Sequence, residues 1–90
     1  MLLLVSYDIT DDKRRTKVAK ILEDFGERVQ FSVFECELTE SQRKQLQKRL
    51  KRYVTDQDSI RYYLLCAACR LKIEIFGKGE VTHDEPYYLA

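Results

Sequence analysis

The chain has few residues that interrupt regular structure: its 90 residues include three glycines and one proline. With 44% hydrophobic and 34% charged residues, this composition excludes a disordered, fibrous or low-complexity protein. A chain of this length forms one small domain with a thin core, so association with a second copy would add apolar burial. We expect a single domain over residues 1–79 and an acidic tail over residues 80–90.

Long apolar runs are also absent. The longest uncharged apolar stretch covers residues 1–7, which is too short for a membrane span or a signal sequence. Three cysteines are an odd number, and without a secretory segment they favour a reducing compartment. We therefore expect a cytoplasmic protein that does not interact with membranes.

Zinc, thiol-redox and nucleophilic sites have little support. Cys66 and Cys69 form a CxxC motif, but only Cys36 and His83 remain as further zinc ligands. A thioredoxin-type motif opens a helix, whereas this one lies between two runs with strand character, so we expect structural cysteines. The single histidine lies in the acidic tail, which disfavours a Ser–His or Cys–His pair.

The positive charge is unevenly distributed although the net charge is only +1. Residues 13–52 contain twelve of the sixteen Lys and Arg residues and six acids, so this stretch carries +6. Such asymmetry suggests a polyanionic partner, although solvated helix faces give the same count. The candidate phosphate-binding residues are Arg14, Arg15, Arg28, Arg43, Lys44 and Lys48.

Two helices and several strands are predicted from the spacing of apolar residues. Residues 2–7 are a continuous apolar run, typical of a central strand buried on both faces. Capping residues at 10–12 begin an amphipathic helix over residues 12–25, which Gly26 ends. A capping box from Thr39 to Gln42 begins a second, strongly basic helix.

The remaining segments favour strands. Residues 28–38 alternate as a tight pair of short strands, and residues 60–66 and 71–76 are rich in β-forming residues. The order is that of an α+β, ferredoxin-like split βαβ fold. We expect an antiparallel sheet with two helices on one face and an extra C-terminal strand.

Asp8 is the leading candidate for chemistry because a carboxylate ends a strand of large apolar residues. Such a group needs a cation or hydrogen-bond donors. It either binds Mg²⁺ or accepts backbone N–H bonds from the following turn. One carboxylate is a poor metal site, but Asp8 of a second, symmetry-related copy would supply another ligand. Asp11 and Asp12 are better explained as helix-capping residues.

Two motifs give the chain a family resemblance. VSYDITDDKRR at residues 5–15 and GERVQFSVFE at residues 26–35 resemble the small CRISPR-associated adaptation protein, often described as a CRISPR-associated endoribonuclease. This family is the non-integrase member of the adaptation pair that acquires spacers. The resemblance extends through the second helix to residue 65 and weakens from Cys66 onward.

The resemblance implies a ferredoxin-like fold and a homodimer in which the last strand, here residues 71–76, joins the partner's sheet. It implies that Asp8 faces its mate near the dimer axis, where one Mg²⁺ binds. Tyr7 and Asp8 match the active-site pair. Arg15, Arg28 and Phe34 match positions that support activity or the cleft, which Ser32 also lines.

Three functions remain open at this point. The first is an adaptation dimer that bridges integrase subunits, binds duplex DNA and hydrolyses single-stranded RNA or double-stranded DNA with Mg²⁺. The second is a scaffold without catalytic activity. The third is the ribonuclease toxin of a toxin–antitoxin pair, because such toxins share this fold.

Overall fold

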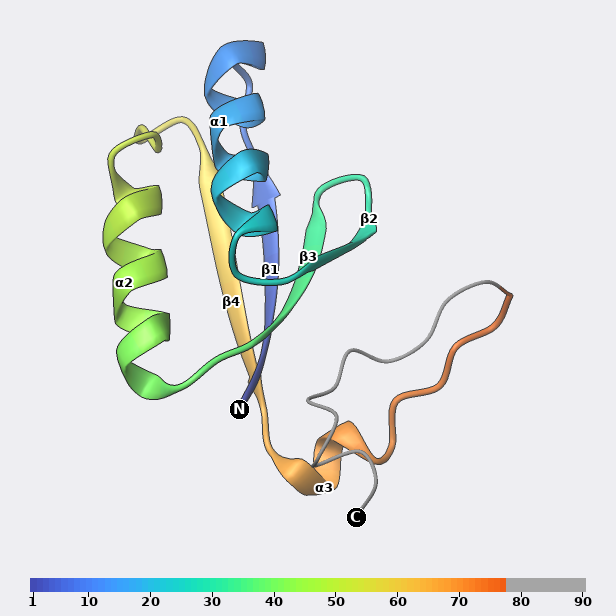
Figure 1. Cartoon of the computed structure of the whole chain (residues 1–90). Coiled ribbons are helices and arrows are strands. Elements are labelled where there is room, and N and C mark those ends of the chain that lie inside the picture. Colours follow the sequence, from blue (N-terminus) through green and yellow to red (C-terminus); the bar gives the residue numbers. More distant parts are fainter. Residues whose placement is uncertain (78–90) are drawn as a thin grey trace.

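The computed structural model describes residues 1–77, and Figure 1 shows how the elements are arranged. The order of the first six elements is the predicted one. In the described part of the chain the elements are β1 (Leu2–Asp8), α1 (Asp12–Glu23), β2 (Glu27–Gln30), β3 (Val33–Glu37), α2 (Glu40–Lys51), β4 (Ser59–Leu65) and α3 (Ala67–Arg70). The expected acidic tail at residues 80–90, including His83, lies outside the described residues. None of the described helices is both long and apolar enough to cross a membrane.

The four strands form one antiparallel sheet in the order β2-β3-β1-β4, so β1 is a central strand as predicted. Helices α1 and α2 lie on the same face of this sheet (Figure 1). The predicted α+β, split βαβ arrangement is confirmed. Burial of β1 on both faces is confirmed only in part: Leu3, Val5 and Tyr7 are buried on one face, whereas on the other Leu2 is buried and Leu4 and Ser6 are half-buried. The helices cover one face, and the other, which we call the open face, stays accessible.

The core lies between the sheet and the two helices. It consists of side chains from β1 and β3 together with the apolar stripes of both helices. Burial of each large aliphatic side chain contributes roughly 1.5–3 kcal/mol. The fully buried members from the helices are Val18, Leu22, Leu46 and Leu50.

Both helices begin at the predicted capping residues. The Asp11 side chain accepts a hydrogen bond from the Arg14 backbone N–H at 2.9 Å. Thr39 Oγ1 accepts from the Gln42 N–H at 3.2 Å, while the Gln42 side chain accepts from the Thr39 N–H at 2.9 Å. These bonds satisfy donors that a helix leaves unpaired at its start.

Gly26 is required by close packing. Helix α1 ends at Glu23, slightly before the predicted residue 25, and the Gly26 N–H donates to the Leu22 carbonyl at 2.9 Å. A Cβ atom at position 26 would lie 2.2 Å from the Glu35 carbonyl oxygen and 2.6 Å from Cys36 Sγ. The turn after α1 therefore approaches β3 so closely that only glycine fits.

The predicted strand over residues 71–76 is wrong for the single chain, because these residues form no ladder with the four strands. The chain instead turns through α3 after β4 and continues as irregular backbone (Figure 1). A strand requires an edge with which to pair, and the prediction assigned that edge to a second copy. The β-forming composition of residues 71–76 thus does not produce a strand by itself.

Candidate functional site

The Asp8 carboxylate is exposed at the end of β1 and has no hydrogen-bond or ion-pair partner among residues 1–77. The proposed acceptance of backbone N–H bonds from the following turn is therefore not seen. The Asp8 backbone is fixed in the ladder opposite Ser59 of β4. This combination places a free carboxylate on a rigid part of the sheet.

Tyr7 and Asp8 point to opposite faces of the sheet because side chains alternate along a strand. Tyr7 is only 4% exposed beneath the helices, whereas Asp8 is on the open face. The strand register places Ser6 and Arg61 on this same open face. Sequence reasoning did not identify Arg61, because its side-chain direction follows only from the pairing of β1 with β4. The predicted Tyr7–Asp8 pair is thus not brought together in one chain.

Tyr7 belongs to an aromatic cluster under the β2–β3 hairpin. Its ring stacks on Phe34 with 6.3 Å between centroids, and its hydroxyl donates to the Phe31 carbonyl at 3.5 Å. The Arg28 guanidinium lies over the Phe34 ring, 5.3 Å from its centroid. Burial raises the pKa of Tyr7, and the nearby Arg28 only partly offsets this effect. Tyr7 and Phe34 therefore stabilise the fold, and Arg28 packs over them.

Arg15 and Arg28 line one hollow of about 490 Å³ between α1 and the β2–β3 hairpin. Arg15 donates to the Ile9 carbonyl at 2.9 Å and pairs with Asp12. The structure thus brings together the predicted residues Tyr7, Arg15 and Arg28, but on the helix-covered side of β1. Ser32 lies in the hairpin turn, where its carbonyl oxygen accepts from the Tyr7 N–H at 3.1 Å.

Arg14, a predicted phosphate ligand, has partners within the chain. Its guanidinium donates to the Tyr53 carbonyl at 2.9 Å and forms an ion pair with Asp58, whose side chain is fully covered. Asp58 also accepts from the Thr55 N–H at 2.8 Å and the Thr10 N–H at 3.3 Å. The Arg14–Asp58 pair therefore connects α1 to the loop before β4.

Replacement of Asp58 by Asn is expected to destabilise the chain at pH 7. The hydrogen bonds from Arg14 and then Thr55 hold the pKa of the Asp58 carboxyl well below its usual range. A lowered folded-state pKa stabilises above the unfolded value, about 3.9, and this stabilisation is lost as pH falls towards the folded value. The difference in unfolding free energy between wild type and Asp58→Asn should narrow below about pH 4, as measured by urea unfolding. A difference that is constant with pH would contradict this assignment.

The predicted basic residues on α2 differ in their surroundings. Arg43 is paired with Glu40 and lies 3.4 Å from Gln47 Oε1. Lys44 and Lys48 are exposed. Their role in binding phosphate stays a prediction, and Arg43 has a competing carboxylate beside it.

The CxxC motif opens a short helix, contrary to the expectation that it lies between two strands. Cys66 precedes α3, and its sulfur accepts from the Cys69 N–H at 3.5 Å. Both thiols are exposed, whereas burial raises the pKa of Cys36 to about 11. The observed role of Cys66 is that of a helix cap.

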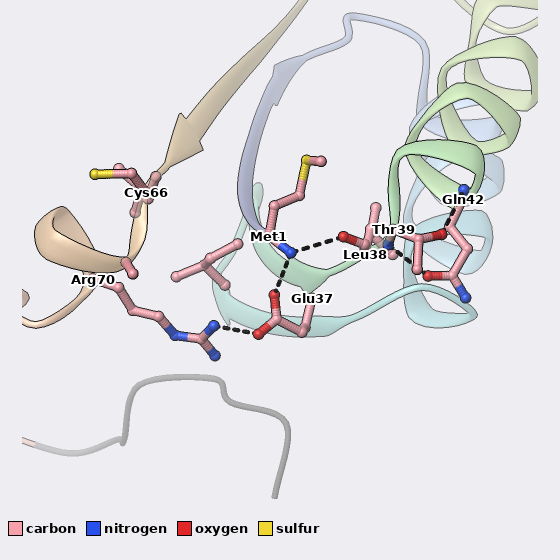
Figure 2. Close-up of a pocket in the computed structure, with 10 residues that line it drawn as sticks. Met1, Glu37, Leu38, Thr39, Gln42, Cys66 and Arg70 are labelled. Carbon is pink, nitrogen blue, oxygen red and sulfur yellow. Dashed lines mark hydrogen bonds and ion pairs between the residues drawn. The ribbon is translucent and has the colours of Figure 1, made fainter. Parts of the chain in front are cut away.

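Beside this motif, Figure 2 shows Arg70 and the amino group of Met1 on different sides of the Glu37 carboxylate. Burial opposes ionisation of Glu37, but the hydrogen bonds from Arg70 and the amino group lower its pKa. The negative charge of Glu37 is therefore compensated by the Arg70 guanidinium and the amino group of Met1.

The donors for a metal ion are sparse within one chain. Among residues 1–77, no group of three or more His, Cys, Asp or Glu side chains comes together as a metal site. The exposed carboxylate of Asp8 supplies one hard oxygen donor group from each chain. This matches Mg²⁺, which often binds one or two carboxylates and retains several waters.

Comparisons with known proteins confirm the resemblance. A family model described as CRISPR associated protein Cas2 matches residues 1–73. The CRISPR-associated endoribonuclease Cas2 1 of Chloroflexus aurantiacus is 51% identical over 81 residues, covering 88% of this chain and 87% of that protein.

Solved structures agree with the fold. The crystal structure of Streptococcus pyogenes Cas2 has a TM-score of 0.75 and 38% identity, covering 86% of this chain and 100% of that one. A chain of a structure described as a partial Cas6-RT-Cas1–Cas2 complex has a TM-score of 0.66 and 30% identity, covering 82% of this chain and 88% of that one. The chain belongs to the Cas2 family of CRISPR-associated proteins.

Proposed function

We propose that this chain acts in CRISPR adaptation as a homodimer that binds duplex DNA and hydrolyses phosphodiester bonds with Mg²⁺ at Asp8. The observation that carries the catalytic part is the exposed Asp8 carboxylate, which lacks a partner among the described residues while its backbone is held in the sheet. A structural aspartate at a strand end normally caps a turn or pairs with a cation. Asp8 does neither within residues 1–77.

A second copy on the open face would complete the site. Tyr63, which the register places on this face beside Leu4, is 46% exposed, and Phe76 in the segment after α3 is fully exposed. Apolar groups of this kind favour association, and a twofold dimer brings together the two copies of each residue that lies at its axis. Asp8 on the same face would then contribute two carboxylates.

Two Asp8 carboxylates are the residues that would hold Mg²⁺. The ion would supply Lewis-acid stabilisation of the phosphate and a more acidic bound water. The contribution of the chain is to hold two carboxylates at fixed positions on a rigid sheet. Arg61, on the same face, donates to the Tyr63 hydroxyl at 3.4 Å and would present positive charge to a phosphate oxygen.

The adaptation role rests on the family. The structure described as a partial Cas6-RT-Cas1–Cas2 complex contains a structural relative of this chain in an assembly with Cas1. We infer that this chain, too, has a Cas1-type integrase as a partner. The basic residues of the two helices would bind the duplex of a new spacer through its phosphates.

The proposal is tested by incubating the full chain with labelled single-stranded RNA and double-stranded DNA, with Mg²⁺ or with EDTA. We expect cleavage with Mg²⁺ and none with EDTA, from a protein that elutes as a dimer in size-exclusion chromatography. Cleavage that persists in EDTA would contradict metal-dependent chemistry. Elution as a monomer would contradict the shared site.

The scaffold function is the second candidate, and one observation favours it. Tyr7, the predicted active-site partner of Asp8, is buried and stacked on Phe34, which is a contact that stabilises the fold. A folded dimer that binds duplex DNA but cleaves neither nucleic acid would establish this alternative.

A further inference from the structure

The CxxC motif lies on the turn that joins β4 to the segment after α3. Cys66 directly precedes α3 and Cys69 is the third residue of this helix. Figure 2 shows Cys66 where β4 passes into α3. The expectation of structural cysteines depended on a motif between two strands, whereas this motif opens a helix, as thioredoxin-type motifs do. The reason given against a redox role therefore does not hold in the structure.

The two sulfurs of the motif lie close together. The Cys66 sulfur accepts a hydrogen bond from the Cys69 N–H at 3.5 Å, as a capping side chain does at the start of a helix. The Cys69 thiol also donates to the Cys66 sulfur. Both side chains are exposed, so small molecules can reach them. A disulfide needs neighbouring sulfurs on backbone positions that face each other, and the first turn of α3 supplies this arrangement.

The two thiols differ in reactivity. Hydrogen bonds from the Cys69 N–H and then from the Cys69 thiol lower the pKa of Cys66, and the contact between the thiols raises the pKa of Cys69. The thiolate is the form that attacks a disulfide, so Cys66 is the better nucleophile. An accessible cysteine of lowered pKa beside a second cysteine is typical of redox-sensitive pairs. Cys36 is excluded from such chemistry because it is buried.

Helix α3 needs support from outside its own four residues, none of which is buried. A helix this short is not stable by itself in water. Arg70 pairs with Glu37 of β3, and the Ile73 N–H donates back to the Arg70 carbonyl at 3.2 Å. The turn built on α3 therefore sets the direction in which residues 71–76 leave β4 (Figure 1).

We propose that Cys66 and Cys69 form a reversible disulfide that fixes α3 and, with it, the direction of residues 71–76. The bond closes a small ring across the first turn of α3, so it opposes opening of the helix. In the reducing compartment expected for this chain such a bond is transient, which suits a switch. The consequence for association rests on the proposed function, because residues 71–76 would reach a second copy only in the proposed homodimer.

The oxidant is a low-molecular-weight disulfide. The Cys66 thiolate attacks one of its sulfurs, which breaks the external S–S bond, forms a mixed disulfide and releases one external thiol. The Cys69 thiolate then attacks the Cys66 sulfur and releases the second external thiol. The two protons of the cysteines pass to the two released thiols. Two protein thiols are thus oxidised while one external disulfide is reduced.

The bond is tested by equilibrating the full chain with reduced and oxidised glutathione at a series of ratios. Mass spectrometry should show the loss of two hydrogens, with the bond mapped to Cys66 and Cys69 and reversed by excess dithiothreitol, while Cys36 stays reduced. The matched variants Cys69→Ser and Cys66→Ser cannot form it. Cys69→Ser should gain glutathione on Cys66 at least about fivefold faster than Cys66→Ser gains it on Cys69. Serine is a preferred capping residue, so Cys66→Ser retains the start of α3.

The effect on α3 is measured by hydrogen exchange of the backbone N–H groups at residues 70–73. Oxidation of the wild type should slow this exchange at least about tenfold and leave exchange in α2 unchanged. Cys66→Ser treated with the same glutathione mixtures should show no such slowing. In the dimer, the oxidised wild type should have a lower dissociation constant than the reduced protein.

Glutathione adducts or intermolecular disulfides as the only products of the wild type would overturn the disulfide. A disulfide that leaves exchange at residues 70–73 unchanged would overturn its action on α3. A dimer whose dissociation constant is the same in both redox states would overturn the link to association. A chain that is monomeric in both states would instead refute the proposed homodimer, whereas the bond and the exchange test the disulfide independently of it.

Discussion

Replacement of Asp8 by Asn is expected to lower Mg²⁺-dependent cleavage at least about a hundredfold, since a metal ion that stabilises the reacting phosphate supplies several kcal/mol and 1.36 kcal/mol is a factor of ten in rate. The substitution keeps the size of the side chain but removes its charge. In a dimer it removes both carboxylates at once. Initial cleavage rates at saturating Mg²⁺ measure the effect.

Asp56→Asn provides the matched control. Asp56 is an exposed carboxylate in the loop before β4, so its replacement makes the same change of charge away from the open face. We expect Asp56→Asn to cleave at the wild-type rate and Asp8→Asn to unfold at the wild-type urea midpoint. Unchanged cleavage by Asp8→Asn would contradict the catalytic role of Asp8.

The helical and sheet framework was predictable because its signals are local. Asp11 and the Thr39–Gln42 capping box set the starts of both helices, and hydrogen bonds within four residues determine those positions. The alternation in residues 28–38 likewise predicted β2 and β3. Local hydrogen bonds and side-chain patterns are sufficient to predict these elements without any knowledge of tertiary contacts.

The site was less predictable because it depends on distant contacts. The family resemblance paired Tyr7 with Asp8, but the pleat of β1 places their side chains on opposite faces of the sheet. Arg14 looked like a phosphate ligand until Asp58, 44 residues away, proved to be its partner. The sequence alone also does not show which sheet edge residues 71–76 would pair with, and these residues form a strand only if such an edge is present.

The two proposed functions, metal-dependent cleavage and DNA binding, therefore lie on opposite sides of the sheet. The open face carries Asp8, and the helix-covered side carries exposed cations such as Lys17, Lys20 and Lys48. A carboxylate next to those cations would compete with phosphate for them, as Glu40 does for Arg43. Separation on opposite sides of one thin domain lets a negative metal site and a positive DNA surface coexist.

Replacement of Phe34 by Ala is expected to cost about 3–5 kcal/mol of unfolding free energy, a large part of the roughly 5–15 kcal/mol available to a domain. The Phe34 ring is completely buried between β3 and the helices, stacks on Tyr7 and lies under Arg28. Its removal leaves a cavity that this rigid sheet cannot fill. Urea unfolding measures the loss.

Phe31→Ala makes the same chemical change at a side chain that is 78% exposed, and it should shift the unfolding free energy by no more than about 0.5 kcal/mol. Phe34→Leu, which retains most of the buried volume, should cost less than Phe34→Ala and leave cleavage near the wild-type rate. Equal destabilisation by the two alanine variants would contradict the packing role. Lost cleavage in a Phe34→Leu variant of wild-type stability would instead place this ring in the catalytic cleft, as the family resemblance allowed.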